Sequence, residues 1–308
     1  MPRSRKTATK ALIGGGATLS GFYGFLVGEA LLARRAIGTT DDRPPSPDGV
    51  YGDDLPGRPI RVLVLGDSAA VGYGVDRADA TPSALIGLGL AHVADAPVEM
   101  QCRAVVGART FDLNGQIDLD PHWHPDVAVI VVGINDLTHQ VTPRASARML
   151  AEVVRRLVAE DCAVVVGTCP DLGTVQPILQ PLRSIARRLS RSLARKQTIS
   201  VVEAGGRAVS LGDLLGPLFA EKRELMFGAD HFHPSATGYA NMVSVLIPAV
   251  AASLRQKQVK VEYAGHSRDL TSVADAAAVS VRHPGTQVVR DAGPGGRFAS
   301  VLRRRRTS

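Results

Sequence analysis

The chain has 308 residues, 45% hydrophobic and 21% charged, which is the composition of an ordinary globular protein long enough to bury a sizeable core. Aromatic residues make up only 4%, which argues against recognition of single-stranded nucleic acid by base stacking. The ends carry the net charge of +7, with +4 in residues 1–10 and +5 in residues 263–308, so the nearly neutral middle argues against a DNA-binding domain and favours targeting or surface attachment.

The amino end has the pattern of an export signal or a membrane anchor. Four basic residues precede ALIGGGATLSGFYGFLVG, an uncharged segment at residues 11–28 that just reaches the length of a membrane-spanning helix. No clear small-x-small cleavage site precedes Arg34, which favours a retained anchor over a cleaved signal; a helix packed on the domain is the remaining alternative. We assign residues 1–33 to this segment and expect an exported protein, membrane-anchored or secreted.

A Pro- and Asp-rich linker is predicted at residues 34–58, followed by a folded domain at residues 59–262. In the domain, short apolar runs alternate with amphipathic segments. The predicted strands are IRVLVLG (60–66), VEMQCRAVVG (98–107), DVAVIVVG (126–133), CAVVVGTCP (162–170) and TISVVEAG (198–205). The predicted helices are TPSALIGLGLAHVA (81–94), TPRASARMLAEVVRRLVAE (142–160), LRSIARRLSRSLARK (182–196) and SATGYANMVSVLIPAVAASL (235–254). Buried strands alternating with helices predict an α/β sandwich around a five-stranded parallel sheet.

Three further features concern the periphery. The tail, residues 263–308, mixes Ala, Gly and Ser with scattered Arg and is predicted to be poorly ordered. The helix at 182–196 carries six basic residues and no acids, so a solvated basic face is the default expectation and contact with anionic lipid the alternative. The three cysteines form no Cys-x-x-Cys pair of the kind that binds metal. We expect buried thiols, and one disulfide is the alternative if the chain is exported.

Four short polar stretches carry the candidate chemistry. LGDSAAVGYG (65–74) puts Ser68 directly after the first strand, VVGART ends the second strand at Gly107, and VVGINDLT puts Asn135 after the third. DHFHP (230–234) follows the last strand. Each stretch alone is typical of a turn or a helix cap. Because the carboxyl ends of parallel strands meet at one edge of a sheet, we expect all four to converge there, where a serine nucleophile would find a base, an acid and oxyanion donors.

These four blocks, in this order, resemble those of the SGNH hydrolase superfamily, the GDSL-like esterases and lipases, over residues 60–254. The resemblance implies a flavodoxin-like three-layer α/β/α sandwich. Similarity is greatest to exported actinobacterial GDSL-like esterases. The first block here reads Gly-Asp-Ser-Ala in place of Gly-Asp-Ser-Leu, and the second lacks its frequent Asn. Neither departure involves a catalytic atom.

The resemblance also implies roles for individual residues. Ser68 would be the nucleophile, His233 the general base and then acid, and Asp230 the residue that orients the imidazole. The backbone N–H groups of Ser68 and Gly107 and the side-chain amide of Asn135 would form the oxyanion hole.

The expected function is hydrolysis of carboxylic esters through an acyl-enzyme, on a small-molecule, lipid or glycan ester. An O-deacetylase or acyltransferase acting on cell-envelope glycan or lipid is the alternative within the enzyme class, and a surface polyanion-binding protein is the alternative outside it. No cofactor, metal or nucleic acid is expected. His122 and His124 in PHWHP lack a third ligand nearby in sequence, and His231 is predicted to be exposed.

Overall fold

A computed structural model of the chain describes residues 44–175, 178–212, 219, 221–258, 271–281, 287–290 and 298–302. The predicted signal or anchor segment lies outside the described residues. The described strands form one sheet in the order β1-β3-β2-β4-β5-β6-β8-β9-β7. Its parallel centre consists of β3 (Val98–Cys102), β2 (Ile60–Gly66), β4 (Val127–Val131), β5 (Ala163–Gly167) and β6 (Arg207–Val209). The predicted five-stranded parallel sheet is therefore confirmed as the core of a larger mixed sheet.

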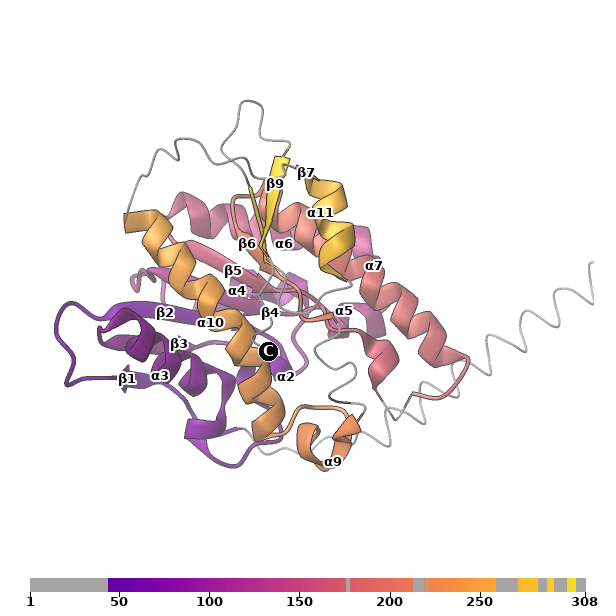
Figure 1. Cartoon of the computed structure of the whole chain (residues 1–308), viewed down its shortest axis with the longest axis horizontal. Coiled ribbons are helices and arrows are strands. Elements are labelled where there is room, and N and C mark those ends of the chain that lie inside the picture. Colours follow the sequence, from indigo (N-terminus) through magenta and orange to yellow (C-terminus); the bar gives the residue numbers. More distant parts are fainter. Residues whose placement is uncertain are drawn as a thin grey trace, which may run out of the picture.

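Helices cover both faces of this sheet (Figure 1). One face packs against α3 (Pro82–Ala94) and α10 (Ala236–Gln258), the other against α4 (Leu113–Ile117), α6 (Pro143–Ala159), α7 (Leu182–Glu203) and α11 (Val273–Ser280). Three shorter helices lie at the carboxyl edge of the parallel strands or in the loops beyond it, namely α2 (Ser68–Val71), α5 (Ile134–Thr138) and α9 (Arg223–Met226). The result is the predicted three-layer α/β/α sandwich.

Helix α10 is long and apolar enough to cross a membrane by length and composition alone. Its Tyr239, Val243, Leu246 and Val250 are instead buried against the sheet, so it serves as a core helix of the folded domain.

The predicted linker contains a strand. Residues Gly49–Tyr51 form β1, which pairs antiparallel with β3 at one border of the sheet. The alternation of side chains in this segment is too short to produce a periodic signal among its Pro and Asp residues. The folded unit therefore begins before the boundary at residue 59 that composition predicted.

The tail was predicted to be poorly ordered, and for its described part this is wrong. Strands β7 (Thr271–Ser272), β8 (Gln287–Arg290) and β9 (Phe298–Leu302) extend the sheet beyond β6, and α11 packs on the same side as α7. Val288 and Ala277 are completely buried. Single apolar residues among Gly, Ala and Arg give the tail no periodic pattern. They become buried because β8 pairs with β6, the last parallel strand of the sheet.

The segment predicted as the fifth strand is helical. Helix α7 continues to Glu203, and the fifth parallel strand is Arg207–Val209. Gln197, Thr198, Val201 and Val202 are buried at helical spacing on one face of α7, so packing against the sheet overrides the β propensity of the Val and Ile residues. Leu189 on the same helix is 40% exposed, although apolar spacing along residues 182–193 predicts it on the buried face.

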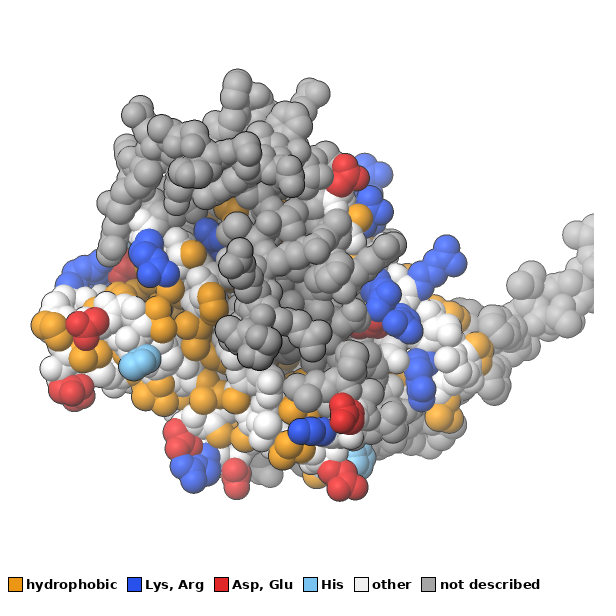
Figure 2. All heavy atoms as spheres, in the orientation of Figure 1, with side chains coloured by type: hydrophobic (Ala, Val, Ile, Leu, Met, Phe, Trp, Pro, Cys, Tyr) orange, Lys and Arg blue, Asp and Glu red, His pale blue; other side chains and the backbone are white. Residues whose placement is uncertain are grey.

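The basic face of α7 is partly engaged by the protein itself. Arg191 and Arg187 lie 2.6 Å and 3.4 Å from the carboxylate of Asp171, whose side chain is completely buried. In the space-filling view, Lys and Arg side chains gather over the α7 side of the molecule (Figure 2). All three cysteines are free thiols, and Cys162 and Cys169 are buried.

Candidate active site

Ser68 lies where the central strand β2 ends. Gly66 closes that strand with φ of +138°, and a Cβ at this position would lie 1.9 Å from the carbonyl oxygen of Val131 on β4, so only glycine fits. The side-chain amide of Gln116 accepts from the Gly66 N–H at 2.9 Å and donates to its carbonyl at 2.8 Å. Asp67 then caps α2, whose first residue is Ser68. This turn leaves Ser68 half-buried at the carboxyl edge of the sheet.

His233 connects Ser68 to Asp230. Its Nε2 lies 2.9 Å from Ser68 Oγ, and its Nδ1 lies 2.5 Å from Asp230 Oδ2. Partial burial raises the pKa of Asp230, but hydrogen bonds from the imidazole and from the N–H groups of Phe232 and His233 outweigh burial and hold the pKa below its ordinary value. An ionised carboxylate therefore faces the imidazole, and residues 165 positions apart in sequence meet through it.

Aromatic rings hold the imidazole of His233 in place. The ring centroids of Tyr73 and Phe232 lie 4.5 Å and 4.9 Å from that of His233. Tyr239 on α10 donates a 2.8 Å hydrogen bond to the carbonyl of Tyr73, which fixes the loop that carries this ring. His233 is only 9% exposed, so its orientation is restricted before any ligand binds.

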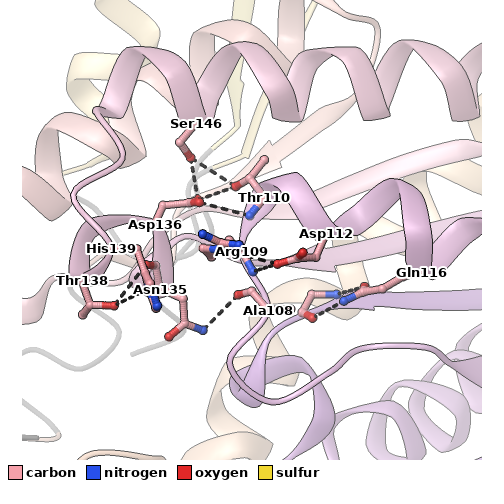
Figure 3. Close-up of polar contacts among 11 residues, drawn as sticks. Ala108, Arg109, Thr110, Asp112, Gln116, Asn135, Asp136, Thr138, His139 and Ser146 are labelled. Atoms are coloured by element: carbon pink, nitrogen blue, oxygen red, sulfur yellow. Dashed lines mark hydrogen bonds and ion pairs between the residues drawn. The ribbon is translucent and has the colours of Figure 1, made fainter.

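The other two predicted donors follow the strands on either side of β2. Gly107 lies in an exposed turn after β3 with φ of +82°, a conformation that favours glycine. Asn135 lies in α5 after β4. Its Nδ2 donates to the carbonyl of Ala108 at 3.0 Å (Figure 3), and because a primary amide carries two N–H groups, one is left for a ligand. The structure thus ties Asn135 to the loop that contains Gly107.

The sequence did not predict the burial of Asp136, the carboxylate next to Asn135. Asp136 is 0% exposed and accepts hydrogen bonds from the Thr110 N–H at 3.2 Å, from Thr110 Oγ1 at 2.5 Å and from Ser146 Oγ at 2.8 Å (Figure 3). The only sequence signal was an acid next to the predicted donor. Its partners lie 26 and 10 residues away and follow from the tertiary structure alone.

Asp67 is a second buried carboxylate beside a candidate catalytic residue. It is 2% exposed, and its Oδ1 accepts from the Ala69 N–H at 3.0 Å. Burial raises the pKa of Asp67 to about 6, against the lowering effect of the Ala69 and Gly133 N–H groups and of His233. The helix cap at this turn is therefore the Asp67 side chain and not the Ser68 hydroxyl.

A small apolar cavity opens beside Ser68 and His233. Its volume is about 40 Å³, room for roughly three water-sized groups. Apolar side chains from several elements line it, among them Ile134, Val175, Leu211, Phe219 and Met242. The cavity suits a short apolar group attached to an atom that reacts at Ser68.

The remaining histidines stand apart from this cluster. His231 is exposed and has φ of +53°, as expected for a turn residue that faces solvent. His122 and His124 are exposed as well. Among the described residues no group of three or more His, Cys, Asp or Glu side chains is arranged to hold a metal ion.

The three-layer α/β/α sandwich, with polar groups at the carboxyl edge of its parallel sheet, is the arrangement of an SGNH-type hydrolase of the esterase and lipase class. The chain belongs to the GDSL-like lipase/acylhydrolase family, whose model matches residues 64–240, and it is therefore a carboxylic ester hydrolase of the GDSL or SGNH type. It is 40% identical over 275 residues to the GDSL-like esterase Rv1075c of Mycobacterium tuberculosis, covering 83% of this chain and 86% of that protein.

Solved structures share the fold at lower identity. The crystal structure of TesA superposes with a TM-score of 0.50 at 19% identity, covering 64% of this chain and 99% of TesA. A mutant of Axe2, an acetyl-xylooligosaccharide esterase from Geobacillus, gives a TM-score of 0.48 at 18% identity, covering 64% and 96% of the two chains.

Proposed function

We propose that the protein hydrolyses carboxylic esters with Ser68 as nucleophile, His233 as general base and acid, and Asp230 as the orienting acid. The observation that carries this proposal is the continuous chain of hydrogen bonds from Ser68 Oγ through both imidazole nitrogens to Asp230. A serine hydroxyl is a weak nucleophile until an adjacent base accepts its proton, and that base needs a partner on its second nitrogen to hold the reactive tautomer.

The reaction proceeds in two balanced halves. Ser68 Oγ bonds to the ester carbonyl carbon while its proton passes to His233 Nε2, and the tetrahedral intermediate collapses as His233 returns that proton to the leaving alcohol. Water then attacks the acyl-enzyme carbonyl carbon and gives a proton to His233. As the bond between that carbon and Ser68 Oγ breaks, His233 returns the proton to Oγ, which releases the carboxylic acid and restores free Ser68. The negative charge on the carbonyl oxygen is stabilised by the N–H groups of Ser68 and Gly107 and by the free amide hydrogen of Asn135.

The cavity favours a short acyl group. A cavity of about 40 Å³ bounded by apolar side chains suits a short acyl group such as an acetyl or propionyl chain. This supports O-deacetylation, of a small ester or of an envelope glycan or lipid, as the form that ester hydrolysis takes here. Acyl transfer uses the same groups, with an acceptor alcohol in place of water.

The test is hydrolysis of p-nitrophenyl esters of increasing chain length by the full chain and three variants. Ser68→Ala and His233→Ala are expected to lower kcat by about a thousandfold or more, with kcat/KM of the parent highest for acetate. His231→Ala is the matched control, since this exposed imidazole lies two residues from His233, and it should stay within about twofold of the parent. Undiminished hydrolysis by Ser68→Ala would refute the mechanism. Sugar and lipid alcohols added as acceptors would separate transfer from hydrolysis.

The amino end and the predicted location remain part of this proposal. The basic flank and the uncharged segment at residues 11–28 support an exported protein, with its catalytic domain outside the cytoplasmic membrane and its substrate among envelope or extracellular esters.

A further inference from the structure

Gly107, one of the candidate oxyanion donors, lies on a turn with little packing of its own. Val105, Val106 and Gly107 are exposed after β3, and around a Cβ built on Gly107 there is nothing within 4 Å. The Val105 N–H donates to the Gly66 carbonyl at 3.1 Å, and the Ala108 N–H donates to the Val105 carbonyl at 3.0 Å. Because the chain then runs directly to Thr110, the position of the Gly107 N–H depends on this turn and on what holds Thr110.

The Asp136 carboxylate accepts hydrogen bonds from both the backbone and the side chain of Thr110. The Thr110 N–H donates to Oδ1 at 3.2 Å, and the Thr110 hydroxyl donates to Oδ2 at 2.5 Å. Asp136 is also the residue after Asn135, whose own amide donates to the Ala108 carbonyl at 3.0 Å. Two parallel links thus join the Gly107 turn to the Asn135 helix, as the close-up shows (Figure 3).

A third contact anchors this pair of links to a rigid element. Ser146 on α6 donates to Asp136 Oδ2 at 2.8 Å and lies 3.2 Å from Thr110 Oγ1. Helix α6 has 17 residues and buries Leu150, Val154 and Leu157 against the sheet, so it moves little. The two carboxylate oxygens accept hydrogen bonds from neutral donors, and among the described residues no cation pairs with Asp136.

We propose that Asp136 is the positioning residue of the oxyanion hole, setting the separation between the Gly107 N–H and the Asn135 amide. The inference rests on the proposed function and deepens it. Asp136 does not touch the substrate. It acts through Thr110 on one donor and through its neighbour Asn135 on the other, so its loss weakens stabilisation of the transition state more than binding of the ground state.

The experiment compares Asp136→Asn and Thr110→Val with the parent in p-nitrophenyl acetate hydrolysis. Thr110→Val keeps the volume and the backbone N–H and removes only the hydroxyl donor. We expect kcat to fall about tenfold to a hundredfold in Asp136→Asn and about threefold to tenfold in Thr110→Val, with KM within about twofold in both. The upper bound is the loss seen when one oxyanion donor is deleted, about a hundredfold to a thousandfold.

A second readout separates positioning from general destabilisation. A trifluoromethyl ketone, which forms a tetrahedral adduct on the serine, should lose affinity by the same factor as kcat/KM. The matched control is Thr198→Val on α7, which removes another buried threonine hydrogen bond, 2.9 Å to the Ala194 carbonyl, away from the site. It should lower the melting temperature and leave kcat within about twofold.

Two results would overturn the inference: unchanged kcat in both Asp136→Asn and Thr110→Val, or a rise in KM at constant kcat. If Asp136→Asn fails to fold, as judged by circular dichroism, the kcat and KM of Thr110→Val alone decide whether the inference stands. Failure of the proposed function is distinguishable, because it would appear as activity retained in Ser68→Ala, whatever Asp136→Asn does.

Discussion

At the scale of single residues, the site places an ionisable carboxyl directly before Ser68, the proposed nucleophile. Asp67 is almost completely buried and its pKa lies at about 6, some two units above the ordinary aspartate value. Burial disfavours the charged form more than the N–H groups of Ala69 and Gly133 favour it. The same side chain caps α2, so the position combines a structural benefit with an electrostatic cost.

The raised pKa of Asp67 makes stability depend on pH with a defined sign. A group whose pKa is higher in the folded state stabilises the fold below its unfolded pKa, and this contribution is lost as pH rises through the folded value of about 6. For Asp67 the loss amounts to about 3 kcal/mol between pH 4 and pH 8. We expect Asp67→Asn to gain stability relative to the parent as pH rises over this range, measured by urea unfolding at several pH values. A difference independent of pH would contradict the shift.

At the scale of elements, the parallel strands place the residues of the candidate site, and antiparallel strand β8 pairs with β6 at the border of the parallel sheet. Gly107, Ser68 and Asn135 follow β3, β2 and β4, which are neighbours in the sheet, so the three converge without any long loop. Strand β6 would otherwise be an exposed border of the sheet, and β8 pairs with it and places Val288 opposite Ala208. Covering a border strand removes a row of unpaired backbone groups.

The role of β8 can be measured with one substitution and its control. Val288 is completely buried, whereas Val50 on β1 is 52% exposed at the opposite border. Val288→Ala should lower the free energy of unfolding by about 1.5–3 kcal/mol, the value of burying a valine side chain, and Val50→Ala by less than about 0.5 kcal/mol. Equal and small losses in thermal or urea unfolding would mean that the carboxyl-terminal strands contribute nothing to the core.

At the scale of the whole molecule, charge and hydrophobicity are divided between the folded unit and the ends. The residues between 11 and 262 carry −2, while the ends carry +4 and +5. Within the folded unit, hydrophobic side chains gather over α3 and α10, and Lys and Arg side chains lie along α7 (Figure 2). Among the described residues, the helix long and apolar enough to span a membrane is α10, which is part of the core. We therefore propose the amino end as the membrane anchor.

Removing residues 1–33 tests this division. The shortened chain is expected in the soluble fraction or the medium, and the full chain in the membrane fraction, because the uncharged segment at residues 11–28 is the part with the length and polarity of an anchor. Its kcat/KM for p-nitrophenyl acetate should match that of the full chain within about twofold, since the candidate site lies in residues 66–233. Membrane association that persists after the deletion would point to the folded domain.

Much of this protein was determined by the sequence itself. Strongly apolar runs such as residues 60–66 and 127–131 predicted buried strands correctly, because burial on both faces of a parallel sheet demands such runs. The four polar stretches were assigned to one edge of the sheet because parallel topology leaves no other arrangement. The resemblance to the SGNH hydrolases distinguished His233 from His231, and the structure gives the His233 imidazole contacts to both Asp230 and Ser68.

Other features were decided only by tertiary structure, and they share a physical reason. The helix continued through Val201 and Val202 because that face packs on the sheet, and β8 formed because β6 offered an unpaired border. Asp136 and Thr110 became partners because the segments after β3 and β4 meet beyond the end of β2, which lies between these two strands. In each case the stabilising contact lies far away in sequence, so local propensity carried no information about it. The sequence determined which chemical groups are present and at which edge; packing determined what holds them there.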